Sequence, residues 1–287
     1  MSSTIKRTTL FAAALAAGIA LPGVANAADL LMDPPVVEAP EIITKSGGWY
    51  IRGDISYDFR STGNPTYNLP GNGGVTSFTS GSVDDSFNIG IGIGYQVNDY
   101  FRADLTGEYI FESDFRGSTA GICPDPDAGD GLPGAPCVSS DSSSYTTFKL
   151  LANAYFDLGH YNGFSPYVGA GIGGAHIDWD GLTNVANCTT TAGSSACPGV
   201  PEGYTATATG STRTDQHGGA DSWRFAWALH AGFAYAITEK TKIDFGYTYS
   251  RIEDGAMFSW LDGSGTQGYD DGFEDHTLRI GLRYQIW

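Results

Sequence analysis

Charged side chains recur at every second position within stretches whose other positions are apolar or glycine. Between Trp49 and Phe59, for example, the even positions include Arg52, Asp54 and Asp58. Opposite charges that share one confined face can form ion pairs, whereas a confined charge without a partner is costly. The spacing therefore predicts a network of ion pairs, which comprises Arg52, Asp54, Asp58, Arg60, Arg102, Asp104, Glu108, Glu112, Lys149, Asp157, Arg224, Lys242, Asp244, Arg279 and Arg283.

The five histidines lie outside the motifs that hydrolases use. None belongs to a Gly-x-Ser-x-Gly or a His-Glu-x-x-His sequence. His176, Asp178 and Asp180 could be read as part of a catalytic pair, but no set of nucleophile, base and orienting group accompanies them. We therefore expect no enzyme activity, no catalytic residue and no cofactor.

The four cysteines fall in pairs within two long polar stretches of the chain. Four cysteines allow three pairings, and the simplest joins Cys123 to Cys137 and Cys188 to Cys197, so that each bond closes one stretch. Metal binding is the alternative, but no Cys-x-x-Cys pair and no nearby histidine supports it. We therefore expect two disulfides, which suits an exported protein, and no metal ligands.

A residue period of two is typical of a β-strand with one apolar and one polar face. Each alternating segment has about the ten residues with which a tilted strand crosses a bilayer. The fifth segment is the weakest and could shift by one residue. The segments are 49–59, 87–97, 101–112, 147–158, 166–177, 223–235, 242–250 and 277–286.

The connections between these segments alternate in length. Short links follow the second, fourth and sixth segments, whereas long polar stretches (61–85, 113–144, 178–221 and 253–274) follow the others. A soluble β-sandwich has no reason to separate short from long connections by side. The pattern predicts an all-β fold, a transmembrane antiparallel up-and-down β-barrel of eight strands with four long outer loops and short periplasmic turns.

The N-terminus has the three parts of a secretory signal peptide. Lys6 and Arg7 precede a short apolar stretch, and Ala25-Asn26-Ala27 has the small-x-small form of a cleavage site. Pro22 and Gly23 interrupt the apolar stretch, which falls short of the roughly 20 residues of a spanning helix. We expect a signal peptide over 1–27, a periplasmic lead over 28–48 and the barrel over 49–287.

The chain is strongly acidic, with a net charge of −17 that becomes −19 once Lys6 and Arg7 are removed with the signal peptide. A nucleic-acid partner is therefore excluded. Acidic clusters in the long stretches would attract divalent cations, which also bridge lipopolysaccharide phosphates. Neither cluster has EF-hand spacing, which favours a solvated acidic surface over a dedicated calcium site. These clusters are Asp125, Asp127 and Asp130, and Asp270, Asp271, Glu274 and Asp275.

Several short motifs resemble one family of bacterial surface proteins. They are Ala-Asp after the cleavage site, the acidic and Pro-rich lead, GGWYIRG at 47–53, PYVGAGIG at 166–173 and LRIGLRY at 278–284. Together they resemble the porin-like, opacity-type outer-membrane proteins of α-proteobacteria. Members usually end on Phe with Tyr two places earlier, whereas here Tyr284 stands three places before Trp287. The resemblance implies an eight-stranded, surface-exposed and often immunogenic barrel with structural or adhesive roles.

An eight-stranded barrel is just wide enough for side chains to fill its interior. We therefore expect a surface-structural or adhesive protein of the bacterial outer membrane with a charge-plugged lumen. Its expected partners are outer-membrane lipid and lipopolysaccharide, the barrel assembly machinery and a possible host or surface ligand at the outer loops. A narrow porin-like channel is the alternative, and an outer-membrane enzyme is the third. Closure of the barrel should let Arg279 and Arg283 reach Arg52 or Asp54 on the first strand.

Overall fold

The computed structural model describes residues 47–69, 74–122, 136–189, 205–207 and 210–286. The predicted signal peptide and all but the last two residues of the predicted lead lie outside this part of the chain. Every named element within it is a β-strand. No helix in the described ranges is long and apolar enough to span a membrane.

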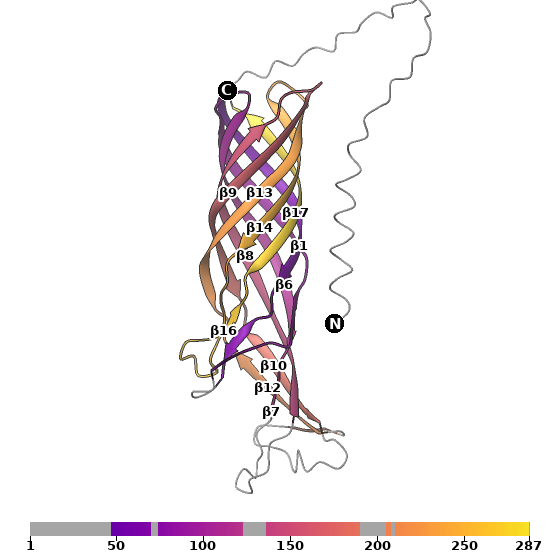
Figure 1. Ribbon diagram of the computed structural model, residues 1–287, viewed down its shortest axis with the longest axis vertical. Coiled ribbons are helices and arrows are strands. Elements are labelled where there is room, and N and C mark those ends of the chain that lie inside the picture. Colours follow the sequence, from indigo (N-terminus) through magenta and orange to yellow (C-terminus); the bar gives the residue numbers. More distant parts are fainter. Residues whose placement is uncertain (1–46, 70–73, 123–135, 190–204, 208–209, 287) are drawn as a thin grey trace, which may run out of the picture. The chain divides into compact units, whose positions relative to one another are not determined.

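Eight long antiparallel strands form a closed ring, as the alternation predicts (Figure 1). The chain order is followed around the ring, and the last strand pairs with the first, so that Ile55 lies opposite Ile280. Closure gives every strand two hydrogen-bonded neighbours, which leaves the ring without an edge. The strands are β1 (Gly48–Thr62), β5 (Ser86–Gln96), β6 (Phe101–Ser118), β8 (Pro136–Asp157), β9 (Phe164–Trp179), β13 (Asp221–Ala236), β14 (Thr241–Ile252) and β17 (Phe273–Gln285).

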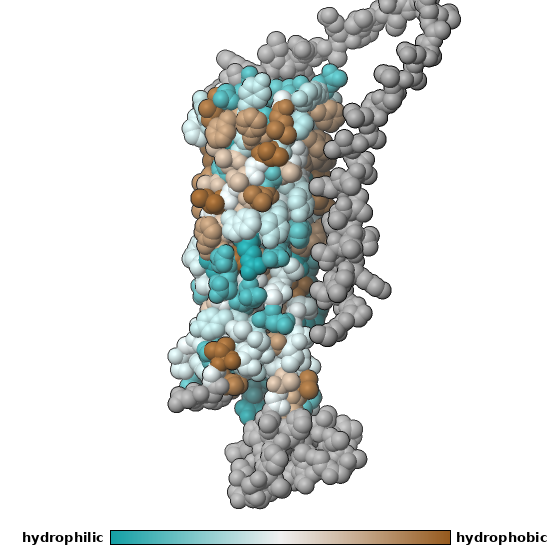
Figure 2. All heavy atoms as spheres, viewed as in Figure 1, coloured by the Kyte–Doolittle hydropathy of each residue, from teal (hydrophilic) through white to brown (hydrophobic). Residues whose placement is uncertain are grey.

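The distribution of side chains is the inverse of that in a soluble protein. Asp58 is fully buried inside the ring, whereas Ile91 on the outside is 74% exposed. Along β1 the inward and outward positions alternate without interruption through the first eleven residues. On the face drawn in Figure 2, apolar side chains gather on the upper part of the barrel, and polar side chains are more frequent farther down.

The two ends of the barrel differ. At the turn end, where β1 begins and β17 ends, the connections 97–100, 158–163 and 237–240 are short. Asn98 tightens the first of these because its side-chain oxygen accepts hydrogen bonds from the backbone N–H groups of Tyr100 and Phe101, at 2.9 and 2.8 Å. Gly163 in the second has a φ of 87°, which favours glycine.

At the loop end, the long connections contain strands that the sequence pattern did not predict. A separate four-stranded sheet, in the order β15-β16-β2-β3, is built from the first and last connections. Further strands extend the ring's own sheet, and β8 begins within the range predicted as a loop. These elements are β2 (Thr66–Asn68), β3 (Val75–Ser77), β4 (Ser80–Val83), β7 (Ala120–Ile122), β10 (Leu182–Thr189), β11 (Thr205–Thr207), β12 (Gly210–His217), β15 (Gly255–Ser259) and β16 (Thr266–Asp270).

A register shift in β6 changes which residues point inward. The pairing of β6 with β8 is irregular between Ile110 and Ser113. Two neighbouring residues, Phe111 and Glu112, are therefore both exposed, and the inward positions resume at Ser113 and Phe115. The prediction that Glu112 belongs to the interior network is wrong, because strict alternation was continued across this bulge.

The topology prediction concerns which end faces the cell exterior. Because an even number of strands returns both ends of the barrel to one side, we expect protease added to intact cells to cut only within 61–85, 113–144, 178–221 and 253–274. Mass spectrometry of the released peptides tests this, with permeabilised cells as the control in which 28–45 becomes accessible. Cleavage within 28–45 on sealed cells would contradict the orientation.

Candidate functional site

The interior of the barrel, its lumen, holds most of the titratable groups that the sequence singled out. Each strand contributes every second side chain, so residues far apart in sequence meet at successive levels between the turn end and the loop end. We group them by their contacts into three rungs and a cap. The first rung, at the turn end, is formed by Arg102, Asp157, Lys242, Asp244 and Arg283.

In the first rung, two arginines each bind one aspartate. Arg102 Nε donates to Asp157 at 3.2 Å, and Arg283 Nη2 donates to Asp244 at 3.0 Å. Lys242 lies beside Arg283 on the neighbouring strand and makes no ion pair within 4 Å among the described residues. This rung therefore holds one more base than acids.

The second rung is formed by Arg52, Asp54, Asp104 and Arg279. The Arg52 guanidinium binds Asp54 through two hydrogen bonds of 2.9 and 2.8 Å and reaches Asp104 at 3.1 Å. Arg279 of the last strand approaches Asp54 of the first at 3.7 Å, which is the contact across the closure that the sequence predicts. Arg283 makes no such contact with β1, because it pairs instead with Asp244 on the neighbouring strand β14.

The third rung is formed by Asp58, Arg60, Glu108, Lys149 and Asp275. Arg60 donates to both oxygens of Asp275, at 2.6 and 3.0 Å, and Lys149 lies 2.9 Å from Glu108. Asp58 lies 3.9 Å from Arg60. With three acids and two bases, this rung has the opposite imbalance to the first.

The cap lies at the loop end of the lumen. Its one ion pair joins Arg224 to Asp270 at 2.6 Å, and the indole N–H of Trp179 donates to the same carboxylate at 3.0 Å. Burial raises the pKa of Asp270, and Arg224 opposes this shift. Around this pair pack the buried aromatic side chains of Phe78, Phe115, Tyr145, Trp179, Phe258 and Phe273.

Two residues of the rungs and cap were missed by sequence analysis and assigned instead to a solvated acidic cluster. Asp275 and Asp270 are both buried. Asp275 has the same parity as Thr277 and Arg279, so extending the alternation of the last strand by two residues would have found it. Asp270 lies in β16, outside the eight barrel strands, and no periodic signal identifies it.

Outside the lumen, every arginine of the described loop end is paired with an acid. Arg116 contacts Asp84 and Asp114, at 3.1 and 3.3 Å, and Arg213 and Arg251 are likewise paired, with Asp215 and Glu274. Further exposed acids surround them, namely Asp85, Glu112, Asp178, Asp180, Asp221, Glu253, Asp254, Asp262 and Asp271. The described loop-end surface is therefore strongly negative.

One polar cluster lies on the loop-end extension of the sheet. Asp141 on β8 accepts hydrogen bonds from Ser139 at 2.7 Å and from Asn184 at 2.5 Å. Burial raises the pKa of Asp141, while these hydrogen bonds oppose the shift. The cluster ties β8 to β10. Ser139 donates its hydroxyl hydrogen to the Asp141 carboxylate and not to a histidine, so the cluster lacks the serine–histidine contact of a hydrolase.

Each histidine hydrogen-bonds one or two neighbouring groups. His160 lies 2.6 Å from Ser165 at the turn end, and His176 lies 3.2 Å from Asp221, not from the acids that follow it in sequence. His230 is buried between Thr248 and Asn153. Within the described ranges, no group of three or more potential metal ligands comes together.

The predicted disulfides lie largely outside the described residues. Cys123 and Cys197 are not described, whereas Cys137 is disulfide-bonded and lies opposite Cys188 in the pairing of β8 with β10. Pairing of Cys123 with Cys137 and of Cys188 with Cys197 stays a prediction.

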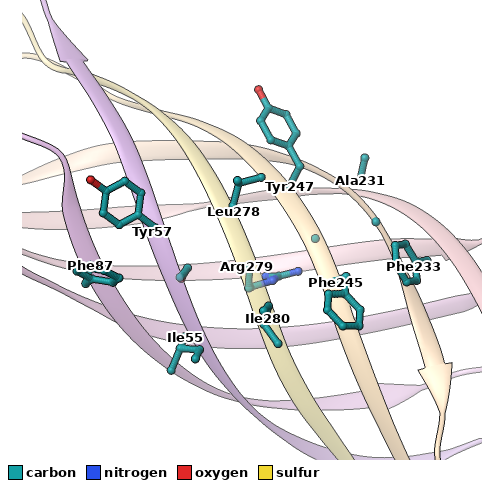
Figure 3. A pocket seen from close by; sticks show the side chains of 13 residues that line it. Ile55, Tyr57, Phe87, Ala231, Phe233, Phe245, Tyr247, Leu278, Arg279 and Ile280 are labelled. Carbon is teal, nitrogen blue, oxygen red and sulfur yellow. The ribbon is translucent and has the colours of Figure 1, made fainter. Parts of the chain in front are cut away.

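A hollow lies on the outer surface of the barrel (Figure 3). It has a volume of about 510 Å³ and crosses β1, β17, β14 and β13. Ala231 leaves space between the larger Phe233, Phe245, Tyr247 and Leu278. Its lining is almost wholly apolar, as the rest of the outer face is. Among the residues that line it, no set of polar groups converges on the hollow as such groups converge on the ligand in a typical active site.

Comparison with known proteins identifies relatives across most of the chain. Residues 11–285 match the family model described as the outer membrane protein beta-barrel domain. An uncharacterized protein of Brucella suis is 34% identical over 91% of this chain and 93% of its own length. A Rickettsia rickettsii protein described as a candidate adhesin is 24% identical over 69% of this chain and 74% of its own length.

Among solved structures, the crystal structure of Neisserial surface protein A is similar to this chain. The match has a TM-score of 0.42 and 15% identity, and it covers 84% of this chain and 100% of the other.

Glu108 and Glu112 form a matched pair for testing the rungs, since only four positions separate them and the bulge sends one inward and the other outward. We expect Glu108→Gln to lower the free energy of unfolding by about 3 kcal/mol, because Lys149 is left without its acid. Glu112→Gln should change it by less than about 0.5 kcal/mol. Urea unfolding in lipid vesicles, followed by tryptophan fluorescence, measures both, and equal effects would contradict the assignment.

Proposed function

Because the chain belongs to the outer membrane β-barrel family and resides in the bacterial outer membrane, we propose that it is a surface-structural and adhesive barrel with a closed lumen. The observation that carries this proposal is the occupancy of the lumen. The charged side chains of three rungs, most of them paired, point into it, and a buried aromatic cluster lies at its loop end. A barrel so filled serves as a scaffold for the elements at its loop end.

Rigidity follows from how the rungs are connected. The Arg60 side chain on β1 joins Asp275 on β17 and stacks over Phe273 at 5.0 Å, while Arg52 joins β1 to Asp104 on β6. Breaking one member leaves its partner confined and unpaired, which opposes any opening of the lumen. This argues against the narrow channel, which would need charges that face open water.

The adhesive part of the proposal rests on the loop end and on the relatives. The extended strands β8, β10 and β12 hold a structured surface beyond the ring, and the Rickettsia relative is described as a candidate adhesin. The described arginines outside the lumen there are all paired with acids, and acids predominate. We therefore propose that the loop end binds a basic surface and does not bind a sulfated or phosphorylated polymer.

The remaining proposed partners are those of any envelope barrel. Outer-membrane lipid would contact the apolar outer face, and divalent cations would link loop-end acids to lipopolysaccharide phosphates. The barrel assembly machinery would insert the chain. We propose no enzymatic role, because no described histidine is joined to both a nucleophile and an orienting acid.

The closed lumen predicts that the purified protein in a planar lipid bilayer produces no stepwise conductance, because bases and acids occupy the path. Protease protection of the same preparation should show that the barrel has inserted into the bilayer. This control distinguishes a closed barrel from a protein that failed to insert. Stepwise openings of the size seen with general porins would defeat the closed-lumen proposal.

The acidic loop end predicts that binding to a basic surface depends on its charge. We expect Glu253→Gln with Asp254→Asn to weaken the binding of intact cells to a polylysine-coated surface severalfold, and added salt to weaken it further. Glu239→Gln with Asp99→Asn is the matched control, since these acids are equally exposed but lie at the turn end.

Flow-cell detachment measures the strength of binding, and surface labelling checks that both variants reach the outer membrane. Equal loss in the two double variants, or tighter binding to a heparin-coated surface than to polylysine, would contradict the basic-partner proposal.

A further inference from the structure

We propose that the first rung of the lumen is a binding site for a phosphate-class oxyanion, entered from the turn end of the barrel. The rung brings three bases, Arg102, Lys242 and Arg283, from β6, β14 and β17 against only two acids, Asp157 and Asp244. A site with one surplus positive charge has the electrostatic requirement for a monoanion. This inference goes beyond the structural and adhesive role.

The hydrogen-bond donors of the rung are incompletely used. Both Nη atoms of Arg102 and the Nε atom of Arg283 are buried and have no hydrogen-bond partner in the described structure. Arg102 is only 1% exposed, and its guanidinium carbon lies 4.0 and 4.6 Å from the ring centroids of Tyr155 and Tyr167, whose rings are nearly perpendicular to each other. These cation–π contacts hold the guanidinium in place without providing an oxygen or nitrogen acceptor for its Nη atoms.

Other unpaired atoms in the lumen do not gather in this way. Among the buried donor atoms of Arg279 only Nε has no hydrogen bond, and it lies 3.7 Å from Asp54, while Nη2 donates to the Tyr167 hydroxyl at 3.2 Å. Asp58 in the third rung presents an unpaired acceptor, which repels an anion. Only the first rung combines several unused donors with a surplus of bases among the described residues.

Of the three bases in this rung, Lys242 is the most accessible, at the turn end of the barrel. Lys242 is half-buried, as are Gln96 and Gln285, which occupy the last inward positions of their strands. Gln96 donates to Asp157 at 3.3 Å, so it supports the acid and leaves the bases free. An entering anion meets the Lys242 ammonium first and then comes within reach of the two guanidinium groups, whose forks match oxyanion geometry.

Lys242 is the residue to test, because its removal breaks no ion pair. We expect inorganic phosphate, at constant ionic strength and in zwitterionic detergent, to bind saturably and to shift the amide NMR signals of residues 102, 242 and 283. Lys242→Gln should weaken binding by about tenfold, since a charge-assisted hydrogen bond is lost. Lys240→Gln is the matched control, because this lysine lies two residues away in the exposed turn.

A second variant guards against loss of the fold. Arg283→Lys keeps a charge beside Asp244 but removes the Nε donor, so we expect weaker phosphate binding with an unchanged NMR fingerprint elsewhere. Acetate, used in parallel, tells whether a carboxylate is accepted as well as phosphate. No saturable binding, equal affinity of the Lys242 and Lys240 variants, or shifts confined to the neighbourhood of Arg116 at the loop end would overturn the site.

Discussion

The pairing of β1 with β17 is the interaction on which the rest of the structure depends. In a bilayer no water satisfies the backbone N–H and C=O groups of an edge strand, so a sheet is stable there only when it closes. Thirteen residues of β1 are in register with β17, from Tyr50 to Thr62. Closure also creates the enclosed space into which alternate side chains must point, and thereby imposes the ion-pair network.

Inside that space, the cost of leaving a charge unpaired explains why most of the network is built from pairs that join distant parts of the chain. Arg60 and Asp275 are separated by 215 residues, yet they are neighbours because the ends of the chain meet. A local pair such as Arg52 with Asp54 satisfies only part of the demand, since Arg52 also reaches Asp104 on β6. The network thus ties the strands together.

The sequence could predict the parts of this structure that follow from a strict period of two. The eight strands, their inward faces and the contact between Arg279 and Asp54 follow from alternation and closure alone. The bulge that turns Glu112 outward could not be predicted, because one inserted residue leaves both flanking patterns intact. The pairing of Arg224 with Asp270 could not be predicted either, because the strand of Asp270 belongs to a separate sheet. Nor could the pairing of Arg283 with Asp244, because it depends on distances within the lumen.

The two ends of the barrel have opposite electrostatic characters, and this follows from how each end meets water. At the loop end the described arginines outside the lumen are exposed or partly exposed, and each is paired with a nearby acid, so the surplus acids define the surface. At the turn end the surplus is basic and lies within the lumen, where the rings of Tyr155 and Tyr167 make cation–π contacts with Arg102 and its Nη atoms have no hydrogen-bond partner. A cation–π contact lowers the free-energy cost of burying a guanidinium group and leaves its N–H groups available as hydrogen-bond donors. Arginine therefore has two roles in this barrel. At the loop end it forms structural ion pairs with nearby acids, and at the turn end Arg102 keeps N–H groups that can bind a ligand.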